Sequence, residues 1–154
     1  MQTVKLNNGI EMPVLGYGVF QVSPEECERC VLDAIGAGYR LIDTAQAYYN
    51  EEDVGNAVAR CGVSRDELFL TTKVWITNAG EEKATRSIDE SLRKLRTDYI
   101  DLYQFHNPAF CPKPGDGSGL YEAALEAKEK GMIRHIGITN HRLKVAHEAI
   151  DSGL

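Results

Sequence analysis

The chain has 154 residues, of which 43% are hydrophobic and 26% are charged. This composition is typical of a globular domain and argues against a disordered chain. A formal net charge of -6 excludes the broad basic face that nucleic acid or an anionic membrane would require. No apolar run approaches the ~20 residues that cross a bilayer, and the N-terminus lacks a signal-peptide pattern. We therefore expect one cytoplasmic domain over residues 1–154.

The chain opens with a predicted hairpin and a first strand and helix. An Asn-Gly pair within KLNNGIEMP is a strong signal for a tight turn between two short strands. A short apolar run at 15–20 then predicts the first strand of the main fold. Ser23 followed by Pro24 marks the start of a helix, and Gly38 marks its end.

The rest of the chain alternates between short apolar runs and longer amphipathic stretches. Five strand and helix units in succession predict parallel strands joined by right-handed crossovers. An open doubly wound sheet and part of a (β/α)8 barrel both fit this alternation. The four later strands are expected at 39–45, 68–75, 98–106 and 133–140, and the helices that follow them at 50–62, 81–96, 120–131 and 141–153.

Four polar residues fall at or just after predicted strands, namely Asp43, Tyr48, Lys73 and His106. In a barrel of strands and helices, catalytic groups lie at the carboxyl ends of the strands. A tyrosine hydroxyl exchanges its proton slowly near neutrality unless an adjacent ammonium, here Lys73, favours the phenolate. Asp43 would keep Lys73 charged, and His106 would donate a hydrogen bond to a substrate oxygen. Such a set suits carbonyl reduction, with the hydride coming from a cofactor.

Other chemistries find less support. The chain has no G-x-G-x-x-G, phosphate-loop or G-x-S-x-G motif. Cys27 and Cys30 form a C-x-x-C pair inside the first predicted helix, without a second pair that would complete a zinc site. We interpret them as reduced structural thiols, with a redox or metal site as the alternative. The histidines lack metal-ligand spacing, and no metal is expected.

Several motifs carry a family resemblance. LIDTAQAYYNEEDVG at 41–55 resembles the signature of the aldo-keto reductases, and TTKVW, DLYQFHNP and GITN are similar to three further motifs of that family. NNGIEMPVLGYGVFQ resembles the family's opening hairpin and first strand. The resemblance implies a TIM-type (β/α)8 barrel, here with about five units after the hairpin, and an NADP(H)-dependent oxidoreductase acting on small aldehydes or ketones. NAD(H) is the alternative cofactor.

The resemblance also assigns residues. It makes Tyr48 the general acid, tuned by Lys73 and Asp43, with His106 orienting the carbonyl. The residues that it places near the nicotinamide are Gly18, Val19, Asp43, Thr139 and Asn140. Those that it places around the substrate are Phe20, Tyr48, Trp75, His106 and Asn107. Thr139 stands where serine is commoner, and Asn107 stands where many members have an aromatic residue, which implies a more polar or open pocket. Core packing is the alternative for Phe20 and Trp75.

Length bears on activity. A complete barrel takes about 250 residues, and its phosphate sites are usually built after strands 7 and 8. A chain of five units is therefore expected to hold the cofactor weakly and to self-associate through exposed sheet edges. Two hypotheses follow. One is a carbonyl reductase, active in a longer chain or with a second chain, and the other is an inactive remnant or interaction module of the same fold that needs a complementing chain.

Overall fold

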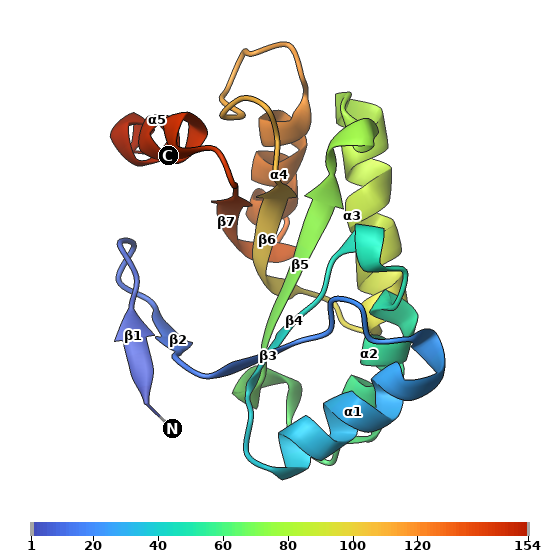
Figure 1. Ribbon diagram of the computed structural model, residues 1–154. Coiled ribbons are helices and arrows are strands. Elements are labelled where there is room, and N and C mark those ends of the chain that lie inside the picture. Colours follow the sequence, from blue (N-terminus) through green and yellow to red (C-terminus); the bar gives the residue numbers. More distant parts are fainter. Residues whose placement is uncertain (1, 154) are drawn as a thin grey trace.

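The computed structural model describes residues 2–153 (Figure 1). A hairpin of two strands precedes five strands that alternate with five helices. The strands are β1 (Thr3–Lys5), β2 (Glu11–Pro13), β3 (Gly16–Gly18), β4 (Leu41–Asp43), β5 (Phe69–Trp75), β6 (Ile100–His106) and β7 (Ile133–Thr139). The helices are α1 (Pro24–Gly36), α2 (Glu51–Arg60), α3 (Glu81–Leu95), α4 (Leu120–Glu129) and α5 (Leu143–Ser152), with 3-10 turns η1 (Gln46–Tyr48), η2 (Arg65–Glu67) and η3 (Ile76–Asn78).

The main sheet has the strand order β3-β4-β5-β6-β7, and every neighbouring pair is parallel. The predicted succession of strand and helix units is therefore confirmed. Strands β3 and β4, the first two of the main sheet, are shorter than predicted, with three residues each. Beyond Asp43 the chain leaves the sheet: the Thr44 amide still donates to the Thr71 carbonyl at 2.9 Å, and the backbone then turns into η1.

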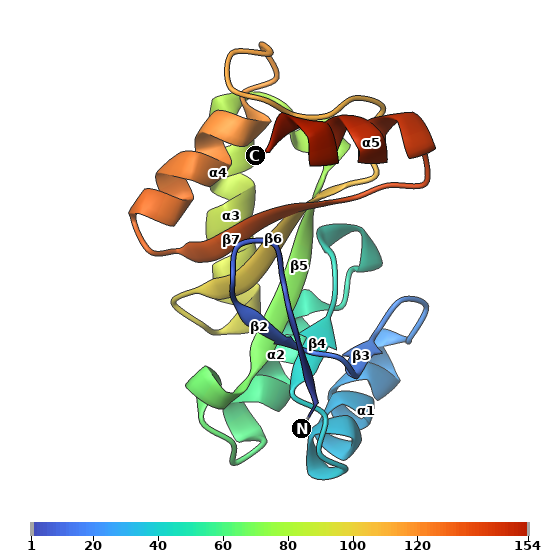
Figure 2. The ribbon, with the colours of Figure 1, turned by 90° about the vertical axis from the view of Figure 1, so that its left-hand side faces the viewer.

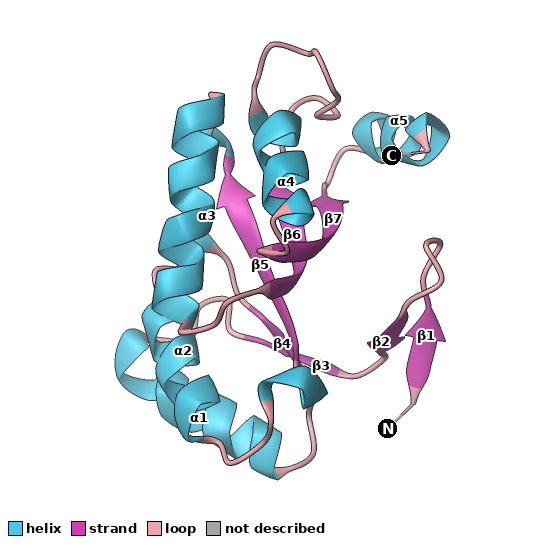
Figure 3. Cartoon of the chain, turned by 180° about the vertical axis from the view of Figure 1, so that it is seen from behind, coloured by secondary structure: helices cyan, strands magenta, loops and turns pink. Residues whose placement is uncertain are grey.

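Helices α1 to α4 cover one side of the sheet, whereas the hairpin and α5 lie on the other side (Figures 1 and 3). The view from that side shows the hairpin in front of β6 and β7, and α5 past the carboxyl end of β7 (Figure 2). A hydrogen bond of 3.0 Å joins Asn8 Nδ2 and His135 Nδ1 and fixes the hairpin tip to β7. Two layers of unequal extent therefore flank the sheet.

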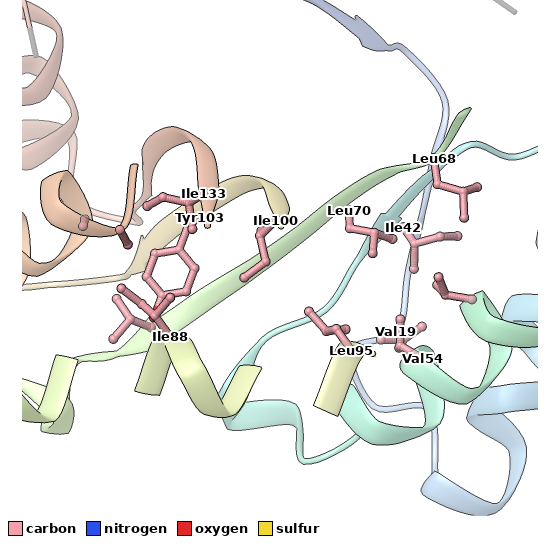
Figure 4. Close-up of a cluster of buried hydrophobic side chains, with 14 of the residues drawn as sticks. Val19, Ile42, Val54, Leu68, Leu70, Ile88, Leu95, Ile100, Tyr103 and Ile133 are labelled. Carbon is pink, nitrogen blue, oxygen red and sulfur yellow. The ribbon is translucent and has the colours of Figure 1, made fainter. Parts of the chain in front are cut away.

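The hydrophobic core lies between the sheet and its helical layer (Figure 4). Strand residues Ile42, Leu70 and Tyr103 are buried to 1% exposure or less. They pack in one cluster with Val54, Ile88 and Leu95 of the helices. Burial of each such side chain contributes about 1.5–3 kcal/mol. The helix predicted at 81–96 forms as α3, which buries Ala84, Ile88 and Leu95.

Close approach of two helices depends on one glycine. A Cβ on Gly55 of α2 would collide with the backbone of Lys94 and Leu95 at the end of α3. Glycine lets the two helix backbones come into contact. This contact holds α2, the helix that follows the turn with Tyr48, against α3.

The side of the sheet that faces the hairpin is only partly covered. A groove of about 660 Å³ lies between the hairpin tip, β6, β7, α4 and α5, and its walls include Leu6, Leu102, Gln104 and Ile136. The hairpin tip therefore covers part of this side of the sheet and leaves the rest open as a groove. Within residues 2–153, no helix combines the length and apolar character needed to span a bilayer.

Candidate active site

The carboxyl ends of three strands bring the polar set together. Asp43 is the last residue of β4, Lys73 lies near the end of β5, and His106 ends β6. Tyr48 ends the turn η1, directly after β4. Because parallel neighbours place their carboxyl ends at one edge, side chains 63 positions apart in sequence converge there.

Lys73 is the hub of this set. Its side chain is 7% exposed, and its Nζ lies 2.6 Å from Asp43 Oδ1, 2.8 Å from the Thr44 carbonyl oxygen and 3.4 Å from Tyr48 Oη. Nζ also lies 4.9 Å from the centre of the Tyr48 ring. The three donors of the ammonium thus have three oxygen partners. The longest of these contacts goes to the tyrosine hydroxyl, so this oxygen keeps capacity for another partner.

Four rings form a row across the strand ends. The ring centres of Phe20 and Tyr48 are 5.0 Å apart, those of Tyr48 and His106 are 5.8 Å apart, and those of His106 and Trp75 are 5.1 Å apart. Phe20 is 64% exposed and Trp75 is 37% exposed. These two aromatic residues therefore lie at the site rather than in the core, the alternative that their sequence left open.

His106 is held in a partly desolvated environment. Its Nδ1 is buried and has no hydrogen-bond partner among the described residues. Burial, and secondarily the nearby Lys73 charge, lowers the pKa of His106 below its usual value. The imidazole is therefore neutral near neutral pH and has a single N–H to donate.

The turn that carries Tyr48 is closed by a buried asparagine. Asn50 accepts a hydrogen bond from Thr44 Oγ1 at 2.9 Å and donates from Nδ2 to the Val19 carbonyl at 2.9 Å. Tyr49 takes the left-handed backbone conformation, with φ 59°, which allows the reversal between η1 and α2. These contacts attach the turn to the β3 side of the site.

The predicted nicotinamide residues do not all present free groups. A Cβ added to Gly18 would meet no atom within 4 Å, so open space lies above β3. Val19 is fully buried, with its N–H bonded to the Asp43 carbonyl at 3.0 Å. Asn140 donates to the Pro108 carbonyl at 2.6 Å and accepts from the Arg142 amide at 2.7 Å. Thr139 ends β7, opposite His106 in the ladder.

Asn107 faces the turn between β7 and α5. It has a left-handed backbone with φ 50°. Its Oδ1 accepts hydrogen bonds from the His141 amide at 3.2 Å and from the Arg142 guanidinium at 3.4 Å. The amide at the position where an aromatic residue is commoner thus anchors the neighbouring turn.

The cysteines are not part of this set of residues. All four cysteines are free thiols, and burial raises the pKa of Cys27 to about 12, which makes it a poor nucleophile. Among residues 2–153, no group of three or more metal-ligating side chains converges.

Sequence reasoning missed two features near these strands. The Gln46 side chain makes five hydrogen bonds beneath the turn η1. Asp101 binds two arginines at the opposite end of the sheet. A charged residue inside the apolar run of β6 was the available signal for Asp101, whereas an isolated glutamine offered none.

A parallel sheet of strand and helix units, with Lys73, Tyr48 and His106 at its carboxyl edge, is the architecture of part of a (β/α) barrel. The sequence model of the "Aldo/keto reductase family" matches residues 14–153, and the chain belongs to that family. An aldo-keto reductase of Mycobacterium avium is 49% identical over 138 residues, which cover 90% of this chain and 48% of the relative. "Methylglyoxal reductase DkgB" of Salmonella typhi is 44% identical over 142 residues, covering 90% and 52%.

Solved structures agree in fold. The Brucella melitensis aldo/keto reductase superposes with a TM-score of 0.87 at 44% identity, covering 99% of this chain and 59% of that one. The Bombyx mori aldo-keto reductase, solved in complex with NADP, gives 0.84 at 34% identity, covering 97% and 54%. The chain thus spans about half the length of the curated relatives it matches, as an N-terminal portion of the TIM-barrel fold.

Proposed function

We propose that the chain carries the proton-transfer site of an NADP(H)-dependent reductase that converts a small aldehyde or ketone to an alcohol. The observation that carries this proposal is the contact of Lys73 with both Asp43 and Tyr48, beside the neutral His106. Family membership and the NADP complex of the silkworm relative support the cofactor.

Tyr48 would donate the proton. Its hydroxyl stands 3.4 Å from the Lys73 ammonium, which favours the phenolate that proton donation leaves behind. Asp43, at 2.6 Å from the same ammonium, is its ion-pair partner in this buried position. The bound cofactor would supply the hydride, because no side chain can.

His106 would orient the carbonyl oxygen. A buried N–H without an acceptor is rarer and costlier than an unpaired lone pair, so the proton belongs on Nε2 rather than on the buried Nδ1. Nε2–H then donates to the substrate oxygen beside Tyr48, while the exposed rings of Phe20 and Trp75 flank the reacting group. The arrangement stabilises the negative charge that develops on that oxygen.

The residues present fit the nicotinamide end of the cofactor. Asp43 is 32% exposed, open space lies above Gly18, and the Thr139 hydroxyl belongs to the same edge. Asn140 would have to exchange its bond to the Pro108 carbonyl for one to the cofactor. The Val19 side chain is in the core, so Val19 would support the cofactor site from below without contacting the nicotinamide through its side chain.

A direct test is NADPH-dependent reduction of methylglyoxal, the substrate in the name of the Salmonella relative. Because the chain spans half of its relatives, the assay uses the chain alone and mixed with the separately produced second half of the Mycobacterium avium relative. We expect little turnover alone and measurable turnover with the complement.

Two neighbouring tyrosines supply the variant and its control. Tyr48→Phe should lower kcat at least about 100-fold, because it removes the general acid. Tyr49→Phe, at an 85% exposed position, should leave turnover unchanged. Turnover that survives Tyr48→Phe contradicts the proposal. Absence of turnover with the complement favours the second hypothesis, an inactive module of the same fold.

A further inference from the structure

The side chain of Gln46 is bonded at both ends of its carboxamide. Nε2 donates to the Ser87 carbonyl at 3.0 Å, to Ser91 Oγ at 3.0 Å and towards Tyr103 Oη at 3.3 Å. Oε1 accepts from the Trp75 amide at 3.1 Å and from Asn78 Nδ2 at 3.0 Å. The two Nε2 hydrogens are shared among three acceptors and both lone pairs of Oε1 are used, so the carboxamide has no hydrogen-bonding capacity left.

These five bonds join four separate elements to one turn. Ser87 and Ser91 belong to α3, Tyr103 to β6, Trp75 to the end of β5, and Asn78 to η3. Gln46 is the first residue of η1, and Tyr48 is its last. Two side-chain carboxamides therefore hold the turn. Asn50 attaches it to the β3 side, and Gln46 attaches it to β5, β6 and α3.

The attachment bears directly on the Lys73 to Tyr48 contact. Trp75 is two residues beyond Lys73 on β5, so the bond from the Trp75 amide to Gln46 Oε1 links the strand that carries the ammonium to the turn that carries the phenol. Tyr48 itself is held by its N–H bond to the Ala45 carbonyl at 2.9 Å, by the 3.4 Å contact of its hydroxyl with Lys73 Nζ and by ring contacts.

We infer that Gln46 is a positioning residue that sets the distance between Tyr48 and Lys73. The carboxamide is required because one end must donate to a fixed carbonyl, that of Ser87, while the other end accepts from a fixed amide, that of Trp75. This inference rests on the proposed reductase function for its catalytic consequence, but the positioning itself can be measured without turnover.

The test compares two glutamines that both lie half-buried near the sheet. Gln46→Met keeps the length and volume of the side chain and removes all five bonds, whereas Gln104→Met on β6 makes the same chemical change away from the turn. In the complemented assay, Gln46→Met should lower kcat roughly tenfold or more with little change in KM, since displacing a reacting group by about 1 Å costs about 100-fold. Gln104→Met should retain the wild-type kcat.

Two readouts do not depend on activity. Hydrogen exchange of the Trp75 amide should become faster in Gln46→Met and stay unchanged in Gln104→Met, because only the first variant removes its acceptor. NMR signals of ¹³C-labelled tyrosine, with Tyr48 assigned through Tyr48→Phe, should shift for Tyr48 in Gln46→Met alone. An unmoved Tyr48 signal, or equal loss of kcat in both methionine variants, overturns the inference.

A second variant covers the case in which Gln46→Met does not fold. Gln46→Glu keeps an acceptor for the Trp75 amide but turns a carboxylate oxygen towards the Ser87 carbonyl. Trp75 exchange should then stay slow while the Tyr48 signal moves; a Tyr48 signal at its wild-type position in this variant contradicts the inference. A wild-type chain without turnover counts against the reductase proposal only, because exchange and NMR still judge the position of Tyr48.

Discussion

Two charged clusters occupy opposite ends of the same strands, and they are built differently. The carboxyl-end cluster consists of Asp43, Tyr48, Lys73 and His106. The amino-end cluster consists of Arg65, Tyr99, Asp101 and Arg134. Both contain an ion pair, which is buried at Asp101 and partly exposed at Asp43. The Asp101 carboxylate is fully engaged, although Tyr99 Oη beside it is buried without a partner among the described residues, whereas Asp43 and His106 keep unused hydrogen-bonding capacity.

In the amino-end cluster both oxygens of the Asp101 carboxylate accept hydrogen bonds. Asp101, with a side chain 4% exposed, accepts from Arg65 at 2.8 Å, from the Leu70 amide at 2.9 Å and from Arg134 at 3.0 Å. The two guanidinium carbons lie 4.0 and 3.8 Å from the centre of the Tyr99 ring, so one aromatic ring holds both cations. Such a closed cluster joins β5, β6 and β7.

In the carboxyl-end cluster some hydrogen-bonding groups have only a long contact or, among residues 2–153, no partner. Asp43 is 32% exposed, the Lys73 to Tyr48 contact is 3.4 Å, and His106 Nδ1 has no partner among the described residues. Barrel proteins of this type separate the two tasks in the same way, with chemistry at the carboxyl ends and stability at the amino ends. The completeness of hydrogen bonding therefore distinguishes a structural ion pair from one suited to catalysis.

The largest expected effect on stability comes from the closed cluster. Asp101→Ala leaves two arginines without their carboxylate and the Leu70 amide without its acceptor, although Arg65 keeps the Leu68 and Tyr99 carbonyls. Loss of one partner of a buried pair costs about 3–5 kcal/mol. We expect about 3 kcal/mol, because Arg134 is 48% exposed and can be hydrated. Urea unfolding measures the change. Asp98→Ala, at an exposed position three residues earlier, is the control, and equal losses in both variants would contradict the comparison.

Lys73→Met should show the reverse pattern. Replacing one charge of a partly buried pair by an apolar side chain of similar length should change the free energy of unfolding by less than about 1 kcal/mol, because Asp43 can be hydrated. Turnover in the complemented assay should fall at least about 100-fold. Lys94→Met, which loses only its ion pair with Glu90 on α3, controls for the loss of a lysine. A loss of unfolding free energy in Lys73→Met as large as that in Asp101→Ala would contradict the difference between the two clusters.

Acidification should act on the carboxyl-end cluster through His106. Burial lowers the pKa of His106 in the folded chain, whereas in the unfolded chain it returns to about 6.5. Below pH ~6.5 the unfolded chain then binds more protons, so this stability, fully present above that pH, is lost as pH falls through the lowered pKa. The free energy of unfolding, measured in urea at stepped pH, should decline less for His106→Gln than for the wild-type chain as the pH falls. An unchanged slope would contradict this, and His135, whose pKa is also lowered by burial, gives a parallel case.

The smallest effect is expected for the outer cation of the closed cluster. Arg134→Ala removes one of two arginines on Asp101 and leaves Arg65 with its carboxylate and its ring contact. A half-exposed ion pair contributes about 0.2–1 kcal/mol, and we expect a loss of that size in thermal or urea unfolding. A loss as large as that of Asp101→Ala would show that the two arginines act as one unit.

The two clusters differ in how far the sequence could predict them. Asp43, Lys73 and His106 stand out because each interrupts or ends an apolar run, and parallel strands then oblige them to meet. Asp101 also interrupts such a run, and the register of β6 and β7 places Arg134 opposite it, but its other partner, Arg65, comes from the turn η2 outside the sheet. Local pattern therefore predicts an edge of the sheet better than it predicts a buried pairing.

The same limit explains the details that sequence reasoning missed. Strand succession was predicted from alternating apolar runs, but β3 and β4 end early, where Asn50 Nδ2 occupies the Val19 carbonyl and the chain turns into η1 after Thr44. The contacts of Gln46 and Asn140 depend on where distant carbonyl groups lie, which periodicity does not report. Self-association through the edges β3 and β7 stays a prediction, testable by sedimentation.

The row of rings has one practical consequence. Trp75 is the chain's single tryptophan, and it lies 5.1 Å from the His106 ring at the mouth of the site. All indole emission therefore originates beside the place where a reduced nicotinamide would bind, and that ring absorbs in the range where indole emits. The molecule thus contains its own optical reporter, and quenching of its fluorescence would register cofactor binding even in a chain that never turns over.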